Sequence, residues 1–346
     1  MTALGEVLET ARRARGLTQA GLAAQAGITQ AALSRYENDL RQPEPEVLAT
    51  LADTLGVTVA FLTHAGRARG GMAMDAHMRR RATAPPGTWR QLEARLNMYR
   101  WHARHLFEEV SLRAEQHVPT LDLLDVTPEQ AARFVRAQWR MPAGPVRRLA
   151  QWLEAAGCLL IGEDFATSRV DGLSQWVGEH PVILFNNAAP PDRVRLTLAH
   201  ELGHLVLHAD ALSVDDVEAQ ANAFAGEFLM PAEVIRPALR NLKIGRLLDL
   251  KREYGVSMQA LVERAYHLGL LGPTQRTSMY KMFSTRGWRS HEPGSDDIAP
   301  EQPALAEAIA QELSMRGLSA PEVASIAGFS EPDRNTLFRA RGLHAI

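Results

Sequence analysis

Cysteine is almost missing from this sequence of 346 residues, which contains only Cys158. A single cysteine excludes a disulfide bond within the chain and a zinc cluster built from several cysteines. Long apolar runs are also missing, both as a membrane-spanning stretch and as the apolar part of a secretion signal in the opening segment MTALGEVLETARRARG. We therefore expect a cytoplasmic protein, because the reducing cytosol keeps a cysteine such as Cys158 free.

An excess of charge of one sign is the third absence, since 38 basic and 40 acidic residues leave a formal net charge of −2. A balanced chain does not bind nucleic acid through its overall charge, so any such binding must come from a local surface. What is present is an ordinary globular composition, with 46% hydrophobic residues. The length is too great for one small core and predicts two or three domains.

Changes in composition along the chain predict where these domains begin and end. Residues 1–64 form a compact block rich in alanine and leucine, and residues 65–90, rich in glycine, proline and arginine, predict a basic linker. Residues 91–275 hold the largest block. Residues 276–346 are expected to form a linker, at 285–303, and a small helical segment. The expected fold class is α+β and mostly helical.

Within the largest block, the spacing of apolar residues predicts helices with a few strands between them. One long amphipathic helix is expected from about residue 90 to 118, and two more on either side of a break at Met141–Pro145. Three apolar runs then predict short strands, the last two forming a hairpin: CLLIG, GLSQWV and PVILFNN.

The N-terminal block contains GLTQAGLAAQAGITQAALSRYEN, which has the layout of a helix-turn-helix. Thr18 and Thr29 are placed to cap two successive helices, and Gly27 supplies the tight turn between them. The helical period points Leu33 and Tyr36 inward. The residues left on the outer face of the second helix are those that would meet base edges and phosphates: Gln30, Ala31, Ser34, Arg35 and Asn38.

The block as a whole, with its five expected helices, resembles the XRE family of DNA-binding domains, the type found in Cro and lambda repressor. Acidic and basic residues balance over residues 1–70, so we expect a homodimer or the basic linker to add affinity. Glu37 is expected to pair with Arg12 or Arg13. The alternative is a helical packing or dimerisation module. Binding to a double-stranded DNA operator would use Gln19, Thr29, Gln30, Ser34, Arg35 and Asn38.

The stretch TLAHELGHLVLH, residues 197–208, carries the pattern H-E-x-x-H within an apolar helical run. On a helix, His200 and His204 lie one turn apart on the same face, as two imidazole ligands of one metal ion require. Glu201 is next to the first histidine, within reach of a water molecule at the metal, where it can act as general base. The pattern predicts the site of a zinc peptidase.

A peptidase site of this kind needs a third protein ligand, and the sequence offers two candidates. His208 follows two turns after His200, too far along one helix to reach the same ion, so we expect it to cap or pack the helix end. Glu218 lies in VEAQANAFAGEFLMP, where small alanines would let a second helix lie close to the first. Glu218 can then complete the site, with Asn222 orienting a histidine from behind. The alternative is a solvated glutamate on an amphipathic helix.

Three segments in this order and spacing, DGLSQWVGEHPVILFNN, DRVRLTLAHELGHLVLH and EAQANAFAGEFLMP, are similar to the ImmA/IrrE family of metallopeptidases. The resemblance runs from about Val146 to Ala265. It implies a zincin-like fold, in which a small sheet packs on two metal-binding helices. It also implies a bound zinc ion, which manganese can replace, and a partner repressor of XRE type as the substrate. The residues that the family pattern implies are the ligands His200, His204 and Glu218 and the catalytic base Glu201.

Together these observations predict a DNA-binding transcriptional regulator that is also a zinc-dependent, site-specific endopeptidase and relieves repression under stress. Two alternatives stay open. One is a regulator or antitoxin-like protein that uses the peptidase fold as a sensor or interaction surface, and the other is a purely structural metal. An intact Glu201 favours the peptidase, because a binding module needs no general base. Structural zinc sites usually have four ligands and prefer cysteine.

Three smaller expectations concern the rest of the chain. The strand PVILFNN is expected to take an extended peptide by strand addition. Residues 247–271 and 315–337 repeat the helix-turn-helix rhythm, with Gly255 and Gly328 in the turns, and we expect packing or partner docking there rather than DNA binding. Donors for a developing oxyanion are expected, without a choice among them, from Tyr254, Arg264, Tyr266 and His267.

Overall fold

A computed structural model of the chain describes residues 4–64, 86–109, 114–209 and 216–339. Residues 65–85, the greater part of the predicted basic linker, lie outside this description. Contacts between Cα atoms group the chain into two units. The second unit contains residues 114–174 and 183–303, and the first contains the rest. The fold class is confirmed as mostly helical with a small sheet, whereas the predicted domain limits stay predictions.

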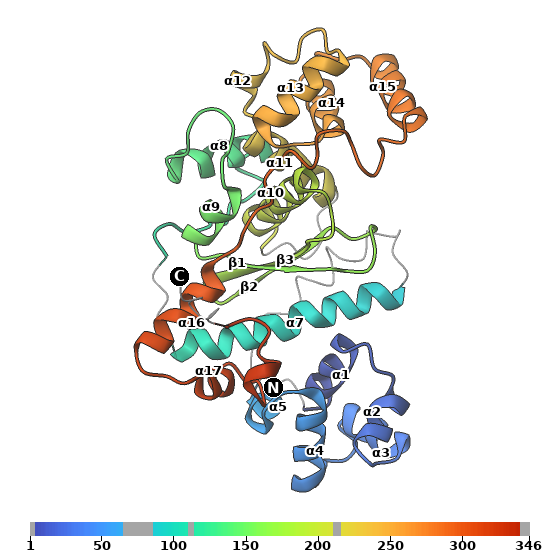
Figure 1. Ribbon diagram of the computed structural model, residues 1–346, viewed down its shortest axis with the longest axis vertical. Coiled ribbons are helices and arrows are strands. Elements are labelled where there is room, and N and C mark those ends of the chain that lie inside the picture. The colour runs from blue at the N-terminus through green and yellow to red at the C-terminus, as the bar shows by residue number, and fades with distance from the viewer. Residues whose placement is uncertain (1–3, 65–85, 110–113, 210–215, 340–346) are drawn as a thin grey trace. The chain divides into compact units, whose positions relative to one another are not determined.

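The first unit is built mainly from helices taken from both ends of the sequence, together with residues 175–182 of a hairpin (Figure 1). Its helices are α1 (Leu4–Ala14), α2 (Gln19–Gln25), α3 (Gln30–Glu37), α4 (Pro45–Leu55), α5 (Val59–His64), α7 (Pro86–Glu109), α16 (Leu305–Met315), α17 (Ala320–Ile326) and the 3-10 turn η2 (Pro332–Arg334).

The core of the first unit lies where the inner faces of α1 to α5 meet. Leu22 and Leu33 are fully buried there, and Trp101 of α7 is 4% exposed in the same cluster. The C-terminal helices join this core, because the N–H of Thr58 donates to the carbonyl of Gly328 at 2.9 Å. The third segment with a helix-turn-helix pattern, residues 315–337, thus packs against the N-terminal helices.

A buried histidine ties three distant segments of the first unit together. The ring of His102 stacks between Phe61 and Phe329, with ring centroids 4.3 and 3.8 Å away. Its Nδ1 lies 2.7 Å from the carbonyl oxygen of Ala327, to which it donates. Burial lowers the pKa of His102 to about 3, so the ring is neutral and acts as an aromatic packing group.

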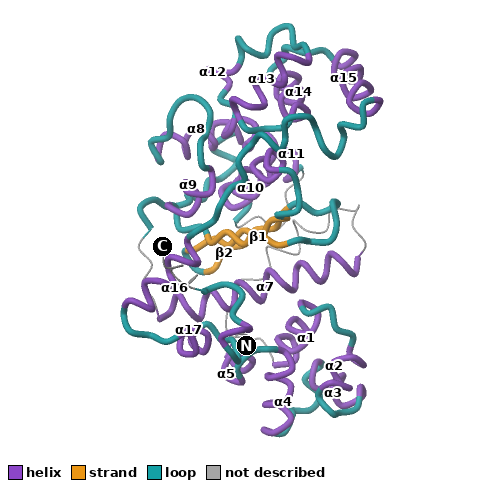
Figure 2. The backbone as a smooth tube through the Cα atoms, viewed as in Figure 1, coloured by secondary structure: helices purple, strands orange, loops and turns teal. Residues whose placement is uncertain are grey.

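The second unit has a three-stranded sheet beside a group of helices, as the tube in Figure 2 shows. The strand order is β1-β3-β2, so β3 is central and β2 lies at an edge. Its elements, with the hairpin strands shared with the first unit, are α8 (Pro128–Gln138), α9 (Leu149–Ala155), β1 (Leu159–Glu163), β2 (Gly172–Val177), β3 (His180–Asn186), α10 (Pro191–Leu207), α11 (Val217–Leu229), α12 (Ala232–Ile235), α13 (Ile244–Tyr254), α14 (Met258–His267) and α15 (Pro273–Thr285).

These elements match the expected ones except at one helix. The three strands, the hairpin and the break between α8 and α9 are found where the sequence predicts them. The helix expected from about residue 90 to 118 begins at Pro86 and ends at Glu109. Residues 114–118 are not helical, because the N–H of Gln116 donates to the carbonyl of Ala155 at 2.9 Å instead of continuing a helix.

Residues 285–303, expected to be a linker, are fixed to the second unit by buried carboxylates. Glu301 accepts hydrogen bonds from the backbone N–H groups of Leu149 and Ala150, at 3.1 and 2.9 Å. These N–H groups open α9 and have no partner within that helix. Glu301 also forms an ion pair with Arg195, whose side chain is 6% exposed. The segment therefore packs as part of the second unit.

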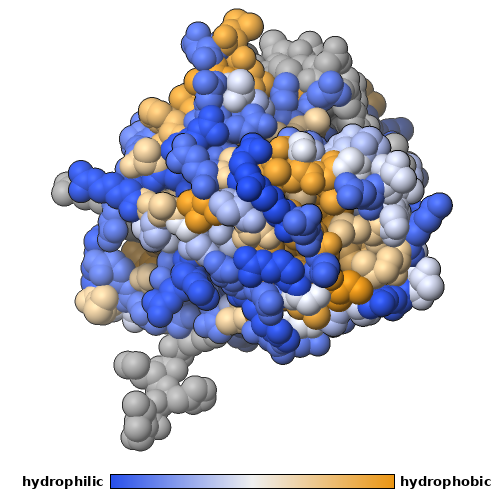
Figure 3. All heavy atoms as spheres, turned by 90° about the horizontal axis from the view of Figure 1, so that it is seen from above, coloured by the Kyte–Doolittle hydropathy of each residue, from blue (hydrophilic) through white to orange (hydrophobic). Residues whose placement is uncertain are grey.

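The surface mixes polar residues with scattered apolar ones. Figure 3 shows a face on which hydrophilic residues prevail, with interrupted apolar patches between them. Within the described ranges, no helix combines the length and the apolar character needed to span a lipid bilayer. The large apolar side chains most exposed to solvent are Leu40, Leu124, Phe134 and Met315.

Candidate metal centre and nucleic-acid interface

Two neighbouring helices of the second unit, α10 and α11, carry the residues expected to bind a metal (Figure 1). Helix α10 has Pro191 in its first turn, where the fixed backbone angle of proline suits a helix start. Gly203 of α10 faces α11, and a Cβ atom there would lie 3.3 Å from the Cα of Ala221 and 3.1 Å from the ring of Phe224. Glycine at this position therefore lets the two helices approach closely.

The side chains of His200, His204 and Glu218 converge between these two helices. The Nε2 atoms of the two histidines lie 3.0 Å apart, and each lies 3.5 Å from a carboxylate oxygen of Glu218. Ligand atoms bound at about 2.0–2.1 Å to a tetrahedral zinc ion lie about 3.3 Å from one another, so this donor set fits such an ion. Two imidazoles and one carboxylate also leave a fourth position open, as a peptidase site requires.

Asn222 orients the first histidine. Its Oδ1 lies 3.0 Å from Nδ1 of His200. Because an amide oxygen only accepts hydrogen bonds, Nδ1 carries the proton and Nε2 keeps its lone pair on the side of Glu218. His200 is 5% exposed, so this orientation is also held by packing. The role of Asn222 behind a bound metal stays a prediction.

A chain of two side chains orients the second histidine. Nε2 of His208 lies 2.8 Å from Oε1 of Gln220 and donates to it, so Nδ1 of His208 is an acceptor. That atom lies 3.0 Å from Nδ1 of His204, which donates and keeps its own Nε2 lone pair for a metal. The backbone N–H of His208 also caps the helix by donating to the carbonyl of His204. Sequence reasoning foresaw the cap and missed the ring contact.

The charge state of the second histidine suits a metal ligand. Burial lowers the pKa of His204, and the hydrogen bond with Glu218 opposes this effect in part. The nearby His200 lowers the pKa of His204 further. The ring is therefore neutral at neutral pH, and only a neutral imidazole has a lone pair to offer at Nε2.

Glu201 is 4% exposed, and strand β2 holds its carboxylate. The hydroxyl of Ser174 donates to Oε2 of Glu201 at 2.8 Å. Gly172 on the same strand lies so close that a Cβ atom would be 2.6 Å from Cγ2 of Thr197 and 3.1 Å from Oε1 of Glu201. Only glycine leaves room for the carboxylate there. A serine within a strand gives no signal of the helix beside it, so sequence reasoning did not find Ser174.

The sheet order corrects one expectation. PVILFNN is β3, the central strand, so both of its edges are already paired and strand addition to it is wrong. Strand β2 lies at the edge of the sheet and carries Ser174 beside Glu201. An extended peptide could pair only with an edge strand, β1 or β2, and β2 is the one that contacts Glu201.

The four candidate oxyanion donors differ in burial and in the groups that they contact. Arg264 is buried, pairs with Glu227, and donates to the carbonyl of Met230 at 3.0 Å, so its guanidinium is already engaged. Tyr254 is 3% exposed. The ring of Tyr266 packs 4.9 Å from the guanidinium of Arg276, and His267 is exposed. The contacts of Arg264 assign it a structural role.

A buried ion pair supports the predicted DNA-binding face of the first unit. Nε of Arg12 donates to Oε1 of Glu37 at 2.6 Å, and its Nη2 donates to Oε2 at 2.8 Å. Arg12 is therefore the partner of Glu37, and Arg13 pairs instead with Glu9 on the surface. Gln19 also donates to Oε2 of Glu37, at 2.8 Å. This network joins α1, α2 and α3 beneath the outer face.

The outer face of α3 presents the side chains expected to contact DNA. Nε2 of Gln30 donates to Oε1 of Gln19 at 2.7 Å, which joins the two glutamines across the turn. Arg35 and Asn38 are exposed, and Ser34 is half-buried. Thr29 has a structural task as well, because its hydroxyl accepts a hydrogen bond from the N–H of Ala32 and caps α3. The contact of these residues with DNA stays a prediction.

Comparison with known proteins bears on both regions. Residues 8–62 match the helix-turn-helix family model, and residues 153–266 match a peptidase family model described as the IrrE N-terminal-like domain. The radiation response metalloprotease IrrE of Deinococcus radiodurans is 40% identical over 74 residues, which cover 18% of this chain and 23% of the relative. The protein of the same name from Deinococcus deserti is 37% identical over 105 residues, covering 25% of this chain and 37% of the relative.

These matches coincide with the two regions described above. The first covers most of α1 and all of α2 to α4, and the second covers the sheet together with α10 and α11. The chain spans only about a quarter to a third of the length of these relatives, at 23% and 37%. The chain thus combines a region that matches the helix-turn-helix family with a region that matches the IrrE N-terminal-like peptidase family.

Proposed function

We propose that this protein is a metal-dependent, site-specific endopeptidase joined to a DNA-binding domain. The observation that carries the proposal is the convergence of ligand atoms from His200, His204 and Glu218 within 4.8 Å of one another. The two histidines lie on α10, which also carries Glu201, and Glu218 lies on α11. Zinc is the ion we propose, with manganese as the alternative, because two histidines and one carboxylate suit both.

The chemistry that a divalent metal ion supplies in such a site is activation of water and polarisation of the scissile carbonyl. Glu201 accepts a proton as the water oxygen bonds to the carbonyl carbon, and it passes this proton to the amine nitrogen as the C–N bond breaks. Ser174 orients the carboxylate of Glu201 through Oε2. Asn222 and His208 each hold one imidazole, so that both Nε2 lone pairs face Glu218.

The substrate would lie along β2 as an added strand. Of the two edge strands, β1 and β2, it is β2 whose Ser174 contacts the carboxylate of Glu201. Pairing through the main chain would give affinity for an extended segment, and the side chains of that segment would give the specificity. Such a segment would bring a peptide bond beside the proposed base.

The DNA-binding domain would place the peptidase at an operator, and the proposed substrate is a partner repressor of XRE type. Cleavage would relieve repression under stress, which is in keeping with the name "radiation response" that both relatives carry. We further propose that the protein is a cytoplasmic homodimer. Two copies would compensate for the weak electrostatic attraction of a nearly neutral DNA-binding block.

Metal content is the first test. One metal ion per chain is expected in the wild type and in Glu201→Gln. Loss of the ion is expected in Glu218→Gln, because of these two glutamates only Glu218 supplies a ligand atom. Inductively coupled plasma mass spectrometry after reconstitution with zinc measures this directly. A wild type that retains no zinc would contradict the peptidase and leave a DNA-binding regulator built on a peptidase fold.

Cleavage is the second test. New N-termini can be labelled and sequenced from cells that express either the wild type or Glu201→Gln after DNA damage. We expect one or very few cytoplasmic proteins to be cut only by the wild type, and at least one of them to contain a helix-turn-helix. A wild type that binds zinc and cuts nothing would favour the alternative in which the fold serves as a sensor.

A further inference from the structure

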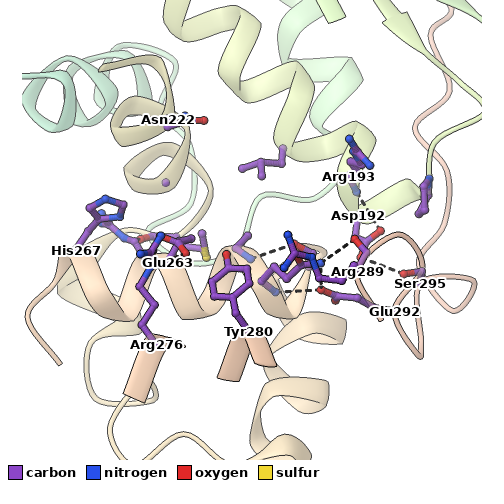
Figure 4. Close-up of a pocket in the computed structure, with 18 of the residues that line it drawn as sticks. Asp192, Arg193, Asn222, Glu263, His267, Arg276, Tyr280, Arg289, Glu292 and Ser295 are labelled. Carbon is purple, nitrogen blue, oxygen red and sulfur yellow. Dashed lines mark hydrogen bonds and ion pairs between the residues drawn. The ribbon is translucent and has the colours of Figure 1, made fainter. Parts of the chain in front are cut away.

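A cavity of about 510 Å³ lies within the second unit, lined by parts of α10, α11, α14, α15 and the segment that follows α15 (Figure 4). Its volume is in the range of pockets that hold small organic molecules, roughly 300–1,000 Å³. One part of the lining is apolar and comes from α10, from α11 with its C-terminal cap residue, and from α14: Leu196, Ala223, Gly226, Met230 and Ala260.

The wall formed by the segment after α15 is fixed in place. Glu292 accepts hydrogen bonds from the N–H groups of Met258 and Gln259, at 2.6 and 3.0 Å, which open α14. Its carboxylate also lies 2.9 Å from Nζ of Lys251, which is fully buried and pairs with Asp192 at 2.6 Å. A buried ion cluster of this kind is costly to take apart, so the cavity is formed before any ligand arrives.

The charges that line the cavity are unequally satisfied. Asp192 and Glu292 are paired with Lys251, and Glu263 forms an ion pair with Arg276 at 2.8 Å. Arg289 is exposed, and among the described residues its guanidinium donates a hydrogen bond only to the hydroxyl of Ser284, at 3.3 Å. The described residues supply no carboxylate within ion-pair distance of Arg289. Arg193, Arg264 and Arg276 pair with carboxylates, so Arg289 is the arginine of the lining that can pair with an anionic ligand.

An aromatic ring lies next to that charge. Figure 4 shows Tyr280 between Arg276 and Arg289, and the guanidinium groups lie 5.6 and 5.7 Å from the centre of its ring. A guanidinium beside an aromatic face is suited to an anionic group attached to a flat ring, because one can pair while the other stacks. This arrangement suits a ligand that is flat, largely apolar and acidic.

The cavity shares one residue with the metal centre. Asn222 lies on α11 and contributes to the lining, and its Oδ1 accepts the hydrogen bond from Nδ1 of His200 at 3.0 Å. A molecule that contacts Asn222 from the cavity acts on the group that sets the orientation of His200. The cavity is thus placed to influence the metal site from behind.

We propose that this cavity binds a small aromatic acid, whose acidic group pairs with Arg289 and whose ring lies against Tyr280 and the apolar lining. We infer that such a ligand changes the affinity of the metal centre through Asn222. The binding itself is independent of the proposed peptidase function, whereas the effect on the metal rests on it.

The experiment uses the metal-free full-length protein and the probe 8-anilinonaphthalene-1-sulfonate, a fluorescent aromatic sulfonate. We expect saturable binding of one probe per chain. Arg289→Ala should weaken binding about tenfold or more, since a hydrogen bond to a charged group contributes about 1.5–3 kcal/mol. Arg286→Ala is the matched control, because its guanidinium lies over Trp288 and it does not line the cavity. That control should bind within about twofold of the wild type.

A second variant tests the place of binding without removing charge. Ala223 is half-buried and lines the cavity, so Ala223→Phe adds a ring to the space where the probe should lie. We expect this variant to keep its helical circular dichroism and to lose probe binding. Equal losses in both arginine variants, or full binding by folded Ala223→Phe, would overturn the proposed site.

The effect on the metal is measured by competition for zinc with a chromophoric chelator, with and without saturating probe. We expect the zinc dissociation constant to change at least threefold in the wild type and to stay constant in Ala223→Phe. A wild type that binds the probe but shows the same zinc affinity overturns the coupling alone. A wild type that binds the probe but no zinc contradicts the peptidase function and leaves the ligand site standing.

Discussion

The metal centre and the predicted DNA-binding face are both built from side chains one turn apart on neighbouring helices. The two regions differ in how these side chains are held in place. At the metal centre His200 and Glu201 are 5% and 4% exposed, and each is held by another side chain. On the DNA-binding face, Gln30 is exposed and bonds to Gln19, which leaves both amides able to exchange this bond for one to DNA.

This difference follows from what each region has to do. A catalytic group is effective only if its position is set before the reaction, so buried partners hold it. A recognition side chain must meet base edges and phosphates, so it stays exposed while the layer beneath it is made rigid. In the first unit that layer is the Arg12–Glu37 pair, whose side chains are 9% and 2% exposed.

The largest effect expected at the metal centre is on catalysis. Replacing Glu201 by glutamine removes the proposed general base and leaves the ligands in place, so cleavage should fall by about 10²–10⁴-fold. Zinc content should stay at the wild-type level. Cleavage of the repressor identified from cells, followed by gel electrophoresis over time, measures the rate. Unchanged cleavage by Glu201→Gln would remove this residue from the mechanism.

The largest effect expected beneath the DNA-binding face is on stability. Glu37→Gln leaves the Arg12 guanidinium buried without its carboxylate, which should cost about 3–5 kcal/mol of unfolding free energy. Urea unfolding followed by circular dichroism measures the change. Glu312→Gln is the control, because Glu312 pairs with Arg316 on the surface and should contribute about 0.5 kcal/mol or less. Equal effects of the two changes would contradict the distinction between the buried pair and the surface pair.

A moderate effect is expected from the histidine behind the metal centre. His208→Phe keeps a ring of similar shape and removes the acceptor for Nδ1–H of His204, so zinc affinity should fall about 10–100-fold. Competition with a chelator measures the dissociation constant, and thermal unfolding of the metal-free protein controls for packing. His208→Asn, which restores an acceptor near the same place, should recover part of the affinity. A fall in stability with no change in zinc affinity would reduce His208 to a packing residue.

A similar or smaller effect is expected on the exposed face. Gln30→Ala should weaken operator binding by about 1–3 kcal/mol at fixed salt concentration, because one contact to a base edge is lost. The unfolding free energy should stay within about 0.5 kcal/mol of the wild type, since the residue is exposed. Fluorescence anisotropy with an operator fragment found by genomic footprinting measures the affinity. Unaltered binding would favour a packing or dimerisation role for the helix-turn-helix.

The smallest effect is expected at Thr29, which caps α3 and is also a predicted DNA contact. Its hydroxyl caps α3, so Thr29→Ala should lower the unfolding free energy by about 1 kcal/mol. Thr29→Ser keeps the cap and should be close to the wild type in stability. If Thr29 also contacts a phosphate, the alanine variant will lose more operator affinity than the serine variant does. Equal stability of all three proteins would contradict the capping role.

Much of the fold and the site can be predicted from the sequence, because the spacing of residues determines which side chains share one face of a helix or strand. Two histidines four positions apart share one face of any helix, and Thr18, Gly27 and Thr29 mark helix ends in any context. Where long-range contacts decide, spacing carries no information. The helix expected to run to about residue 118 ends at Glu109, and the backbone beyond it bonds instead to Ala155, which is distant in the sequence.

Residue spacing was enough to predict the helical faces, the strands and the candidate metal ligands, because local periodicity and capping depend only on neighbouring residues. Tertiary structure alone decided that β3 is central and β2 lies at the edge beside Glu201, since strand order depends on how distant segments pair. It also decided that His208 reaches Gln220 and that Glu301 reaches the start of α9. These are contacts between side chains on separate elements, and only packing brings them within hydrogen-bond distance.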